Sequence, residues 1–374
     1  MIGTELPARI LEISSYPPPR AGWGVRISFV RAHLEAEGHE CRVLNIGPSR
    51  RIKSRHYLDV QNGRHYASQV LHHVRRGYLI HTHINGDSPK GLVLALFAQL
   101  ACAALGRPCV LTFHAGPIQL LFPKSQSKRW APLFRIVFAL PRFIICNSEV
   151  VRQRILEYAN RSKTIVPIPA FSRQYLSFER VPLPAETEVF VASHRPLVGA
   201  YFFFRPEFFV SSLIDALGRI AERLPEAGFL LLGGDSQSEA MTQLIDRAGL
   251  RERVCLAGDL PHDVFLTALS HCHMVVRTPK KDGVSSSVLE ALALGIPVIA
   301  SENGTRPESV VTFAADDAED LSAAVLRVWA DYDTYRARVI RPALRDTIAE
   351  EAALLQAVAR GRDWRALIGA EPPI

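Results

Sequence analysis

The sequence predicts an α/β protein built from two doubly wound domains, each with a parallel sheet. Its 374 residues are enough for two separate cores, because single cores stop growing at about 250–300 residues. Short apolar segments alternate with helical segments in both halves, an order typical of βαβ units. Residues 176–188, rich in proline and charge, separate the two halves and predict a linker.

The first domain is predicted to cover residues 1–175. We expect strands at residues 9–14, 39–44, 79–83, 108–114 and 143–147, and helices at residues 25–38, 88–105 and 149–158. The segment between the first strand and the first helix is rich in turn formers and predicts a loop.

The second domain is predicted to cover residues 189–345, followed by a helical segment over residues 346–374. Strands are expected at residues 188–193, 229–232, 254–256 and 273–276, and helices at residues 209–224, 242–248, 262–269 and 320–330. In open parallel sheets, ligands bind beyond the carboxyl ends of the strands, so the loops that follow these strands are the first places to look for a site.

The composition indicates an ordinary globular protein of the cytoplasm. Hydrophobic residues make up 48% of the chain and charged residues 22%. The six cysteines form no CxxC pair and lie mostly in apolar runs, which is typical of reduced core thiols. No signal peptide opens the sequence, and the longest apolar run, residues 92–105, is too short to span a bilayer. The His271–His273 triplet has no second ligand cluster, so no metal site is expected.

Charge is distributed unevenly along the chain. Residues 1–172 carry 23 Lys and Arg against 9 Asp and Glu, whereas the remainder carries 21 against 28. The basic half favours an anionic partner or is simply a solvated surface. Residues 123–143 mix five cations with aromatic residues and predict a basic amphipathic helix, which either lies on an anionic membrane or packs on the sheet. No signature of nucleic-acid binding is present.

The most informative segment is Lys280–Ser301, KKDGVSSSVLEALALGIPVIAS. It predicts a helix capped by a serine of the run Ser285–Ser287, then a tight turn at Gly295 into a buried strand. A helix N-terminus suits a diphosphate because its N–H groups are unpaired and its dipole is positive there. Asp282 and Glu290 lie eight residues apart, about 12 Å along a helix. The two carboxylates are therefore spaced to hold two distant hydroxylated parts of an extended ligand such as a nucleotide-sugar.

This pattern resembles the E-x7-E signature of the retaining family 4 glycosyltransferases. The first acidic residue is Asp282 rather than Glu, and Ser285 stands where the family commonly has glycine. The resemblance continues through LEALALGIPVIAS and residues 302–308, and it extends over nearly the whole chain. It implies the GT-B fold, with two Rossmann-like domains facing a central cleft and a C-terminal helix, residues 346–374, that crosses back to the first domain.

The resemblance implies that the second domain binds the donor. Glu290 would hold the ribose hydroxyls, and Asp282 would hydrogen-bond the transferred sugar and act in catalysis. Gly233 and Gly258 match loops that approach the nucleotide, although both also suit ordinary turns. The positions expected to meet the diphosphate are Gly283, Val284, Ser285 and Ser286.

The cation that neutralises the diphosphate is less well defined by the resemblance. The family commonly has an Arg and a Lys in a pattern like R-x4-K-G, but here Phe208-Phe209 occupies the Lys-Gly position. Arg205 is the preferred substitute. The other cations that are near in the sequence are Lys281, Lys280 and Arg195.

In the first domain, the resemblance places His114 near the reacting sugar, as a second catalytic residue. Gly22 and Gly24 match a flexible loop over the donor diphosphate. A structural role for each of these residues is the alternative. The residues expected to meet the acceptor are His83, Asn85 and Lys90.

The resemblance thus implies a retaining hexosyltransferase that moves a sugar from a UDP- or GDP-sugar to a hydroxyl of a glycan or lipid-linked acceptor. The implied process is assembly of cell-surface polysaccharide or glycolipid, with peripheral attachment to the inner face of the plasma membrane. No cofactor beyond the co-substrate, no obligatory metal and no protein nucleophile are expected. The alternatives are a sugar-nucleotide epimerase of the same fold, which would isomerise the donor without an acceptor, and an inactive homologue that binds membranes.

Overall fold

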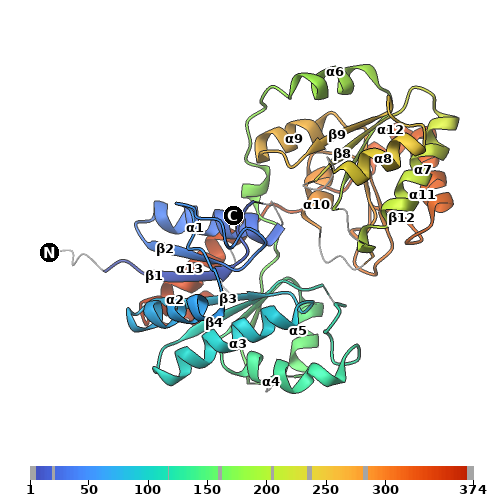
Figure 1. The fold of residues 1–374 in the computed structure, drawn as a ribbon. Coiled ribbons are helices and arrows are strands. Elements are labelled where there is room, and N and C mark those ends of the chain that lie inside the picture. The colour runs from blue at the N-terminus through green and yellow to red at the C-terminus, as the bar shows by residue number, and fades with distance from the viewer. Residues whose placement is uncertain are drawn as a thin grey trace. The chain divides into compact units, whose positions relative to one another are not determined.

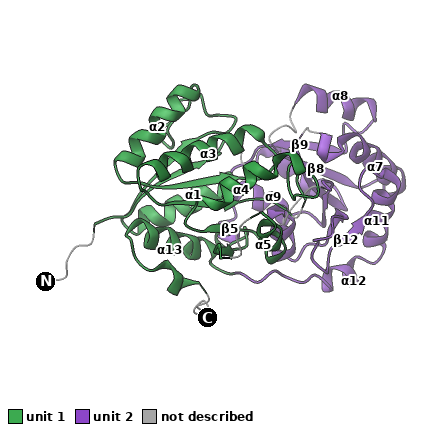
Figure 2. Ribbon diagram, turned by 90° about the horizontal axis from the view of Figure 1, so that it is seen from below, with its two compact units in different colours: residues 1–174, 345–374 green, residues 175–344 purple. Residues whose placement is uncertain are grey.

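The computed structural model describes residues 6–18, 22–116, 118–158, 162–203, 206–233, 238–280 and 285–368. The chain divides into two compact units, shown in green and purple in Figure 2. Unit 1 comprises residues 1–174 and 345–374, and unit 2 comprises residues 175–344. The last thirty residues therefore fold with the beginning of the chain.

Within the described residues, unit 1 contains a six-stranded parallel sheet of order β2-β1-β3-β4-β5-β6. Its strands are β1 (Arg9–Ser14), β2 (Glu40–Asn45), β3 (Leu79–Ile84), β4 (Cys109–Phe113), β5 (Ile144–Cys146) and β6 (Ile165–Pro167). All residues of β3 and β4 are buried, as expected for central strands that are covered on both faces.

Helices cover both faces of this sheet (Figure 1). They are α1 (Gly22–Ala36), α2 (Gly63–Arg75), α3 (Pro89–Ala104), α4 (Ala131–Ala139), α5 (Glu149–Leu156) and α13 (Thr347–Ala359). One face packs on α1 and α13, where Ile10 meets Val30 and Leu355. The other face packs on α2 and α3, where Leu11 meets Val70. Neighbouring residues of β1 thus point to opposite faces, following the period of two of a strand.

Unit 2 contains, in its described part, a second six-stranded parallel sheet of order β12-β11-β10-β7-β8-β9. Its strands are β7 (Leu197–Tyr201), β8 (Gly228–Leu232), β9 (Val254–Gly258), β10 (Met274–Arg277), β11 (Val298–Ser301) and β12 (Val311–Phe313). Its helices are α6 (Ala185–Ser193), α7 (Val210–Arg223), α8 (Glu239–Arg247), α9 (His262–Ser270), α10 (Ser286–Ala293), α11 (Ala318–Ala330) and α12 (Tyr332–Ala337). Short 3₁₀ turns occur at residues 128–130, 173–176, 206–208 and 364–367.

The predicted strand at residues 188–193 is wrong, because these residues form the second half of helix α6, which starts inside the predicted linker. The valine- and phenylalanine-rich segment suggested a strand, but Thr187 is the buried residue of this helix and Val189 is exposed. A central strand needs burial on both faces, and β7 has that burial.

Two further predictions in unit 1 are wrong in their boundaries. Helix α1 starts at Gly22, so Gly22, Trp23 and Gly24 form its first turn rather than a flexible loop. The predicted helix over residues 123–143 is reduced to a 3₁₀ turn followed by α4, because Phe143 leads into strand β5. Helices α2 and α12 and strands β6 and β12 were not assigned from the sequence.

A buried ion pair joins the two ends of unit 1. Arg26 on α1 donates to Glu351 on α13, with Nε 2.7 Å from Oε2, and both side chains are almost fully buried. The remaining Arg26 donors meet the backbone carbonyl of Ala170 at 2.9 Å and both Oγ1 and the carbonyl of Thr347, at 3.0 and 2.9 Å. The guanidinium therefore fixes α13 beside α1, as Figure 1 shows.

No helix among the described residues is long and apolar enough to cross a membrane.

Breaking this pair should strongly destabilise unit 1. We expect Glu351→Gln to lower the free energy of unfolding by about 3–5 kcal/mol, because it leaves the Arg26 guanidinium buried without its carboxylate. The matched control is Glu35→Gln, which removes the exposed i,i+4 partner of Arg31 and should cost about 0.5 kcal/mol or less. Urea denaturation followed by circular dichroism measures both, and equal losses in the two variants would contradict the assignment.

Candidate active site

A column of polar side chains crosses the otherwise apolar sheet of unit 1, on the face covered by α1 and α13. Glu12 on β1 lies opposite His81 on β3 in the strand register, and His83 on β3 lies opposite Thr112 on β4. Residues two apart on a strand share a face, so His81 and His83 point to the same side. His114 directly follows β4 and completes the column at the carboxyl end of the sheet.

These side chains form a continuous chain of close contacts. Nε2 of His83 lies 2.7 Å from Oε2 of Glu12, and Nδ1 of His83 lies 2.8 Å from Nε2 of His114. Nδ1 of His81 lies 2.8 Å from the same Oε2 of Glu12, as an ion-pair contact. The structure thus brings together two predicted site residues, His83 and His114, and joins both to a buried carboxylate.

A second branch leads to the buried ion pair. Nε2 of His81 lies 2.7 Å from Oγ1 of Thr112. That hydroxyl lies 3.5 Å from Oε1 of Glu351, the carboxylate that pairs with Arg26. The histidine column and the interhelical pair are therefore parts of one network.

Burial and neighbouring charges separate the pKa values of the three histidines. Burial alone would lower the pKa of His81, but the carboxylates of Glu12 and Glu351 outweigh it and raise that pKa above its usual value. Burial, reinforced by the nearby His81, holds the pKa of His83 well below its usual range. Burial and the neighbouring His83 do the same for His114. At neutral pH, His81 is therefore the favoured cation, and His83 and His114 are neutral.

The hydrogen bonds assign the tautomers of the two neutral histidines. Because the carboxylate of Glu12 accepts, Nε2 of His83 carries the proton and its Nδ1 accepts. Nε2 of His114 must then donate to His83, which leaves Nδ1 of His114 as an acceptor. Glu12 thus determines, through His83, which nitrogen of His114 is free to accept a hydrogen bond.

Of the other predicted segments of unit 1, only the one around Gly22 and Gly24 is shown to contact this column. Trp23 packs edge-on against His114, with ring centroids 5.2 Å apart. Gly24 lets α1 approach the segment after β1, since a Cβ there would lie 3.3 Å from the carbonyl oxygen of Ser15. Asn85 is used in a local turn, with its Oδ1 accepting the Asp87 N–H at 3.1 Å. Lys90 is exposed on the first turn of α3.

Glu12, His81 and His83 are also a group that could hold a metal ion, because their ligand atoms all lie within 4.8 Å of one another. Of this group, the two histidines were expected to meet the acceptor, whereas Glu12 was not predicted as a site residue. The contacts at 2.7 and 2.8 Å are explained by hydrogen bonding and charge pairing without a metal. The His271–His273 triplet was considered as a metal cluster from the sequence. In the structure, Nδ1 of His273 accepts a hydrogen bond from the Leu197 N–H at 3.1 Å.

In unit 2, the described part of the predicted donor segment forms the start of α10. Ser285 is the N-cap residue, and its hydroxyl lies 3.1 Å from that of Ser287 rather than capping a backbone N–H. Ser286 is the first residue of the helix. The turn after the helix has Gly295 at φ +77°, and buried strand β11 follows, as predicted.

Glu290 is buried on α10 with 5% of its surface exposed. Burial raises the pKa of its carboxyl to about 8, and the positive charge of Arg277 opposes that shift. Arg277, at the end of β10, donates to the carbonyl of Tyr201 at 2.9 Å and lies over the ring of Phe208 at 5.0 Å. A buried carboxyl and a buried cation are thus neighbours at the carboxyl edge of this sheet.

Loops at the same edge are joined by Arg306, which donates to the carbonyls of Ser301 and Pro279 at 2.9 and 2.8 Å. Gly233 follows β8 at φ +132°, and a Cβ there would lie 2.0 Å from the carbonyl oxygen of Phe202. Gly258 ends β9 at φ +76° and accepts the Gly233 N–H at 3.0 Å. Both glycines are therefore required by the backbone conformation itself.

The predicted site residues that lie outside the described part of the chain are Arg205, Lys281, Asp282, Gly283 and Val284.

The sequence placed His81, with His83, in a strand-end segment that could meet the acceptor, but Glu12, Thr112, Glu351 and Arg277 were not predicted as parts of these two sites. A signal for Glu12 was present, because a lone carboxylate inside an apolar strand needs a buried partner. The alternation His81-Thr-His83 was a second signal, since it places both rings on one face. The sequence contained no signal for Glu351, because its partner Arg26 lies 325 residues away in the chain.

Comparison with known proteins agrees with this architecture. Residues 203–331 match the family model described as glycosyl transferases group 1. An uncharacterized glycosyltransferase of Bacillus subtilis, YqgM, is 24% identical over 63% of this chain and 61% of its own length. The 2-deoxystreptamine N-acetyl-D-glucosaminyltransferase of Streptomyces fradiae is 25% identical over 65% of this chain and 59% of its own. The chain thus spans about three fifths of the length of these two relatives.

Solved structures resemble nearly the whole chain. Anabaena HepE in complex with UDP-glucose superposes with a TM-score of 0.64, at 18% identity, over 96% of both chains. A UDP-N-acetylglucosamine 2-epimerase superposes with a TM-score of 0.61, at 15% identity, over 98% of both chains. The likeness supports the predicted two-domain, Rossmann-like GT-B fold. The chain therefore has the GT-B fold, and its residues 203–331 match the family model described as glycosyl transferases group 1.

Proposed function

We propose that this protein is a retaining hexosyltransferase of family 4 that moves a sugar from a nucleoside-diphosphate donor to a hydroxyl of a glycan or lipid-linked acceptor. The observation that carries the proposal is the buried Glu290 carboxyl beside Arg277 on the matched glycosyl transferases group 1 domain. Buried titratable groups with shifted pKa values mark binding and catalytic sites more often than surface groups do. This sugar transfer would take part in the assembly of cell-surface polysaccharide or glycolipid.

The donor would bind at the carboxyl edge of the unit 2 sheet. Glu290 would meet the ribose hydroxyls, and Asp282 would hold the transferred sugar. The start of α10 offers backbone N–H groups and a positive dipole end to the diphosphate. Arg277 supplies a buried cation on the same edge, alongside the predicted Arg205 and Lys281. The UDP-glucose complex of HepE makes a UDP-sugar the first donor to test, with a GDP-sugar as the second.

His114 would act on the transferred sugar as a hydrogen-bond acceptor through Nδ1. Its neutral state and its tautomer follow from the contacts with His83 and Glu12, so no proton has to move before the sugar binds. Preorganised polar groups of this kind stabilise charge without reorganising during the reaction. The acceptor side would include His83, Asn85 and Lys90.

Positioning and stabilisation of the leaving diphosphate would supply most of the catalysis. The leaving phosphate would take the acceptor proton on the same face, which retains the anomeric configuration without a protein nucleophile. A divalent metal is not needed for this scheme, because cations and the start of α10 neutralise the diphosphate. Activity should therefore survive dialysis against a chelator.

An epimerase of the same fold is the second candidate, because an epimerase is among the similar structures. An isomerised sugar nucleotide formed without acceptor would favour it over a transferase.

We also propose that unit 1 attaches peripherally to the cytoplasmic face of an anionic membrane, where a lipid-linked acceptor would be found. The segment over residues 118–136 exposes four cations and three large apolar side chains together. They are Lys124, Lys128, Arg129, Arg135, Ile118, Leu120 and Ile136. Mixed basic and apolar surface of this kind suits the interface of an anionic bilayer.

Donor binding should depend on Glu290. We expect one nucleotide class among UDP-, GDP- and ADP-sugars to raise the melting temperature of the wild type, and Glu290→Gln to abolish that rise. Glu222→Gln, an exposed acid on α7, is the matched control and should keep the full response. A response retained in Glu290→Gln would show that the donor binds elsewhere.

The same variant has a second readout that needs no ligand. Because the folded pKa of Glu290 is raised to about 8, its contribution to stability is complete below the ordinary value of 4.5 and is lost as the pH rises toward 8. Unfolding curves of the wild type should therefore lose up to about 1.4 kcal/mol per pH unit relative to Glu290→Gln in that window. Parallel pH profiles would contradict a buried, protonated Glu290.

The role of Glu12 in orienting His114 can be separated from a structural role. We expect Glu12→Gln to lower kcat tenfold or more with little change in the KM of the donor, because an amide no longer enforces the His83 tautomer. Nitrogen NMR of labelled histidine should report the Nε2–H form of His114 in the wild type and a mixture in the variant. An unchanged tautomer with reduced activity would overturn the assignment.

Membrane attachment should depend on the exposed cations of unit 1. Reversing two charges, Arg129→Glu with Arg135→Glu, should reduce cosedimentation with phosphatidylglycerol vesicles at least tenfold, since each basic residue contributes about 1 kcal/mol. Arg223→Glu on α7 is the control and should bind as the wild type does. No binding by the wild type would remove the membrane from the proposal.

A further inference from the structure

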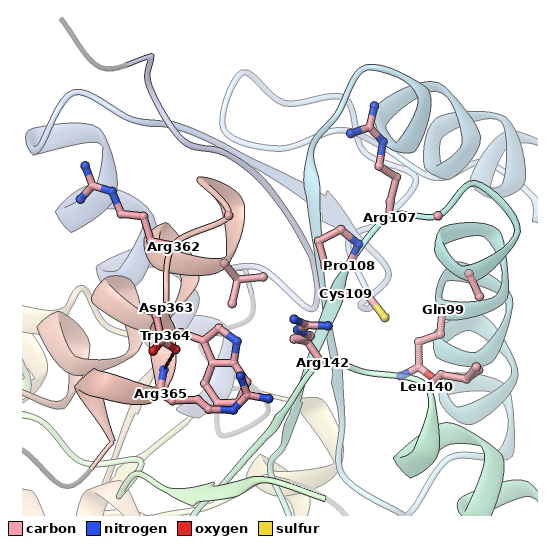
Figure 3. A pocket seen from close by; sticks show the side chains of 14 residues that line it. Gln99, Arg107, Pro108, Cys109, Leu140, Arg142, Arg362, Asp363, Trp364 and Arg365 are labelled. Atoms are coloured by element: carbon pink, nitrogen blue, oxygen red, sulfur yellow. Dashed lines mark hydrogen bonds between the residues drawn. The ribbon is translucent and has the colours of Figure 1, made fainter. Parts of the chain in front are cut away.

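A cavity of about 630 Å³ lies in unit 1 at the edge of the sheet where β4 and β5 begin (Figure 3). Its walls come from the end of α3, the turn before β4, the turn before β5 and the segment after α13. His83 and His114 follow the carboxyl ends of β3 and β4, so the cavity belongs to the opposite edge of the same sheet. It is therefore separate from the candidate active site.

The lining is strongly basic. Arg107, Arg142, Arg362 and Arg365 line the cavity, and Asp363 is the one acidic residue among the described residues of its lining. The Asp363 carboxylate already accepts the backbone N–H of Arg365, at 3.0 Å. Within the described residues, the guanidinium groups of Arg107, Arg142 and Arg365 form no ion pair.

A further cation, Lys163, lies near one of these arginines, Arg142. Lys163 donates to the carbonyl of Ala139 at 2.8 Å, and burial together with the charge of Arg142 lowers its pKa. Arg107, Arg142 and Arg365 thus line one edge of unit 1 with no carboxylate partner in the part of the chain that the structure describes. Such an excess attracts an oxyanion, and a planar guanidinium binds phosphate with paired N–H donors.

The cavity also has ordered walls and an unused hydrogen-bonding group. Trp364 is buried against Phe143, with ring centroids 4.7 Å apart, and holds the Arg365 guanidinium 5.0 Å from its ring. Gln99 is fully buried and lines the cavity. Its Nε2 donates to Thr82 Oγ1 at 3.4 Å, and its Oε1 has no partner among the described residues. If the Gln99 amide is flipped by 180°, Oε1 meets Thr82 and Nε2 has no partner. Either orientation therefore leaves one amide atom for a ligand.

We propose that this cavity binds a sugar phosphate at a second site, remote from the active site. A phosphate monoester carries a charge of about −1.5 to −2 at pH 7, enough to pair with two guanidinium groups. The sugar hydroxyls would meet the amide of Gln99. A volume of about 630 Å³ suits a ligand of this size. The inference does not depend on the identity of the nucleotide donor.

The test is titration calorimetry of the full chain with glucose 6-phosphate. We expect saturable binding by the wild type, at least tenfold weaker in Arg142→Gln and in Arg365→Gln. Arg135→Gln is the matched control, because Arg135 is an exposed arginine of unit 1 that does not line the cavity. Tryptophan fluorescence should change on binding in the wild type but not in Trp364→Phe.

Further ligands distinguish the alternatives. Glucose should not bind, inorganic phosphate should bind more weakly than glucose 6-phosphate, and glucuronate should bind more weakly still because it carries a single charge. Absence of binding, equal binding by Arg142→Gln, or equal affinity for phosphate alone would overturn the proposal. Arg142→Gln should respond to nucleotide-sugars as the wild type does, so failure here is distinguishable from failure of the proposed function.

Discussion

The need to pair buried charges governs the arrangement of unit 1. The carboxylates of Glu12 and Glu351 lie in its interior, and each is costly to bury without a partner. The guanidinium of Arg26 and the imidazole of His81, whose pKa is raised, balance these two negative charges. Because the four side chains come from β1, β3, α1 and α13, satisfying them fixes both helices against the sheet. Helix α13 is therefore held against the sheet by ion pairing and hydrogen bonds as well as by apolar packing.

The pairing of buried charges also affects the candidate active site. Glu12 uses the same oxygen to contact His81 inside the sheet and His83 toward its carboxyl end, and His83 meets His114. A network that stabilises the fold thus also decides the tautomer of the residue expected to face the sugar. In unit 2, the corresponding feature is the buried Glu290 near Arg277. In both units, a buried titratable group is retained at the carboxyl edge of a parallel sheet, where open α/β folds bind their ligands.

Much of the fold could be predicted from local patterns, because strands and helices in doubly wound domains alternate with clear periods. The helix start within the serine run, the turn at Gly295 and the strand after it were predicted correctly, although the Ser285 hydroxyl does not cap the helix. Residues 188–193 show the limit of this reasoning. Valine and phenylalanine favour a strand there, but these residues are helical and do not pair with the sheet. The more buried segment at residues 197–201 forms the central strand instead.

The sequence by itself determined the α/β class, the motif over residues 280–301 and the histidines at the ends of β3 and β4, because each depends on residues close together in the chain. Tertiary structure alone decided which buried groups meet. Arg26 and Glu351 are 325 residues apart, and Glu12 and His83 are 71 apart. The arginine cavity likewise joins residues 99–109 with 358–365. Contacts between distant segments depend on strand order and helix packing, which no local pattern specifies.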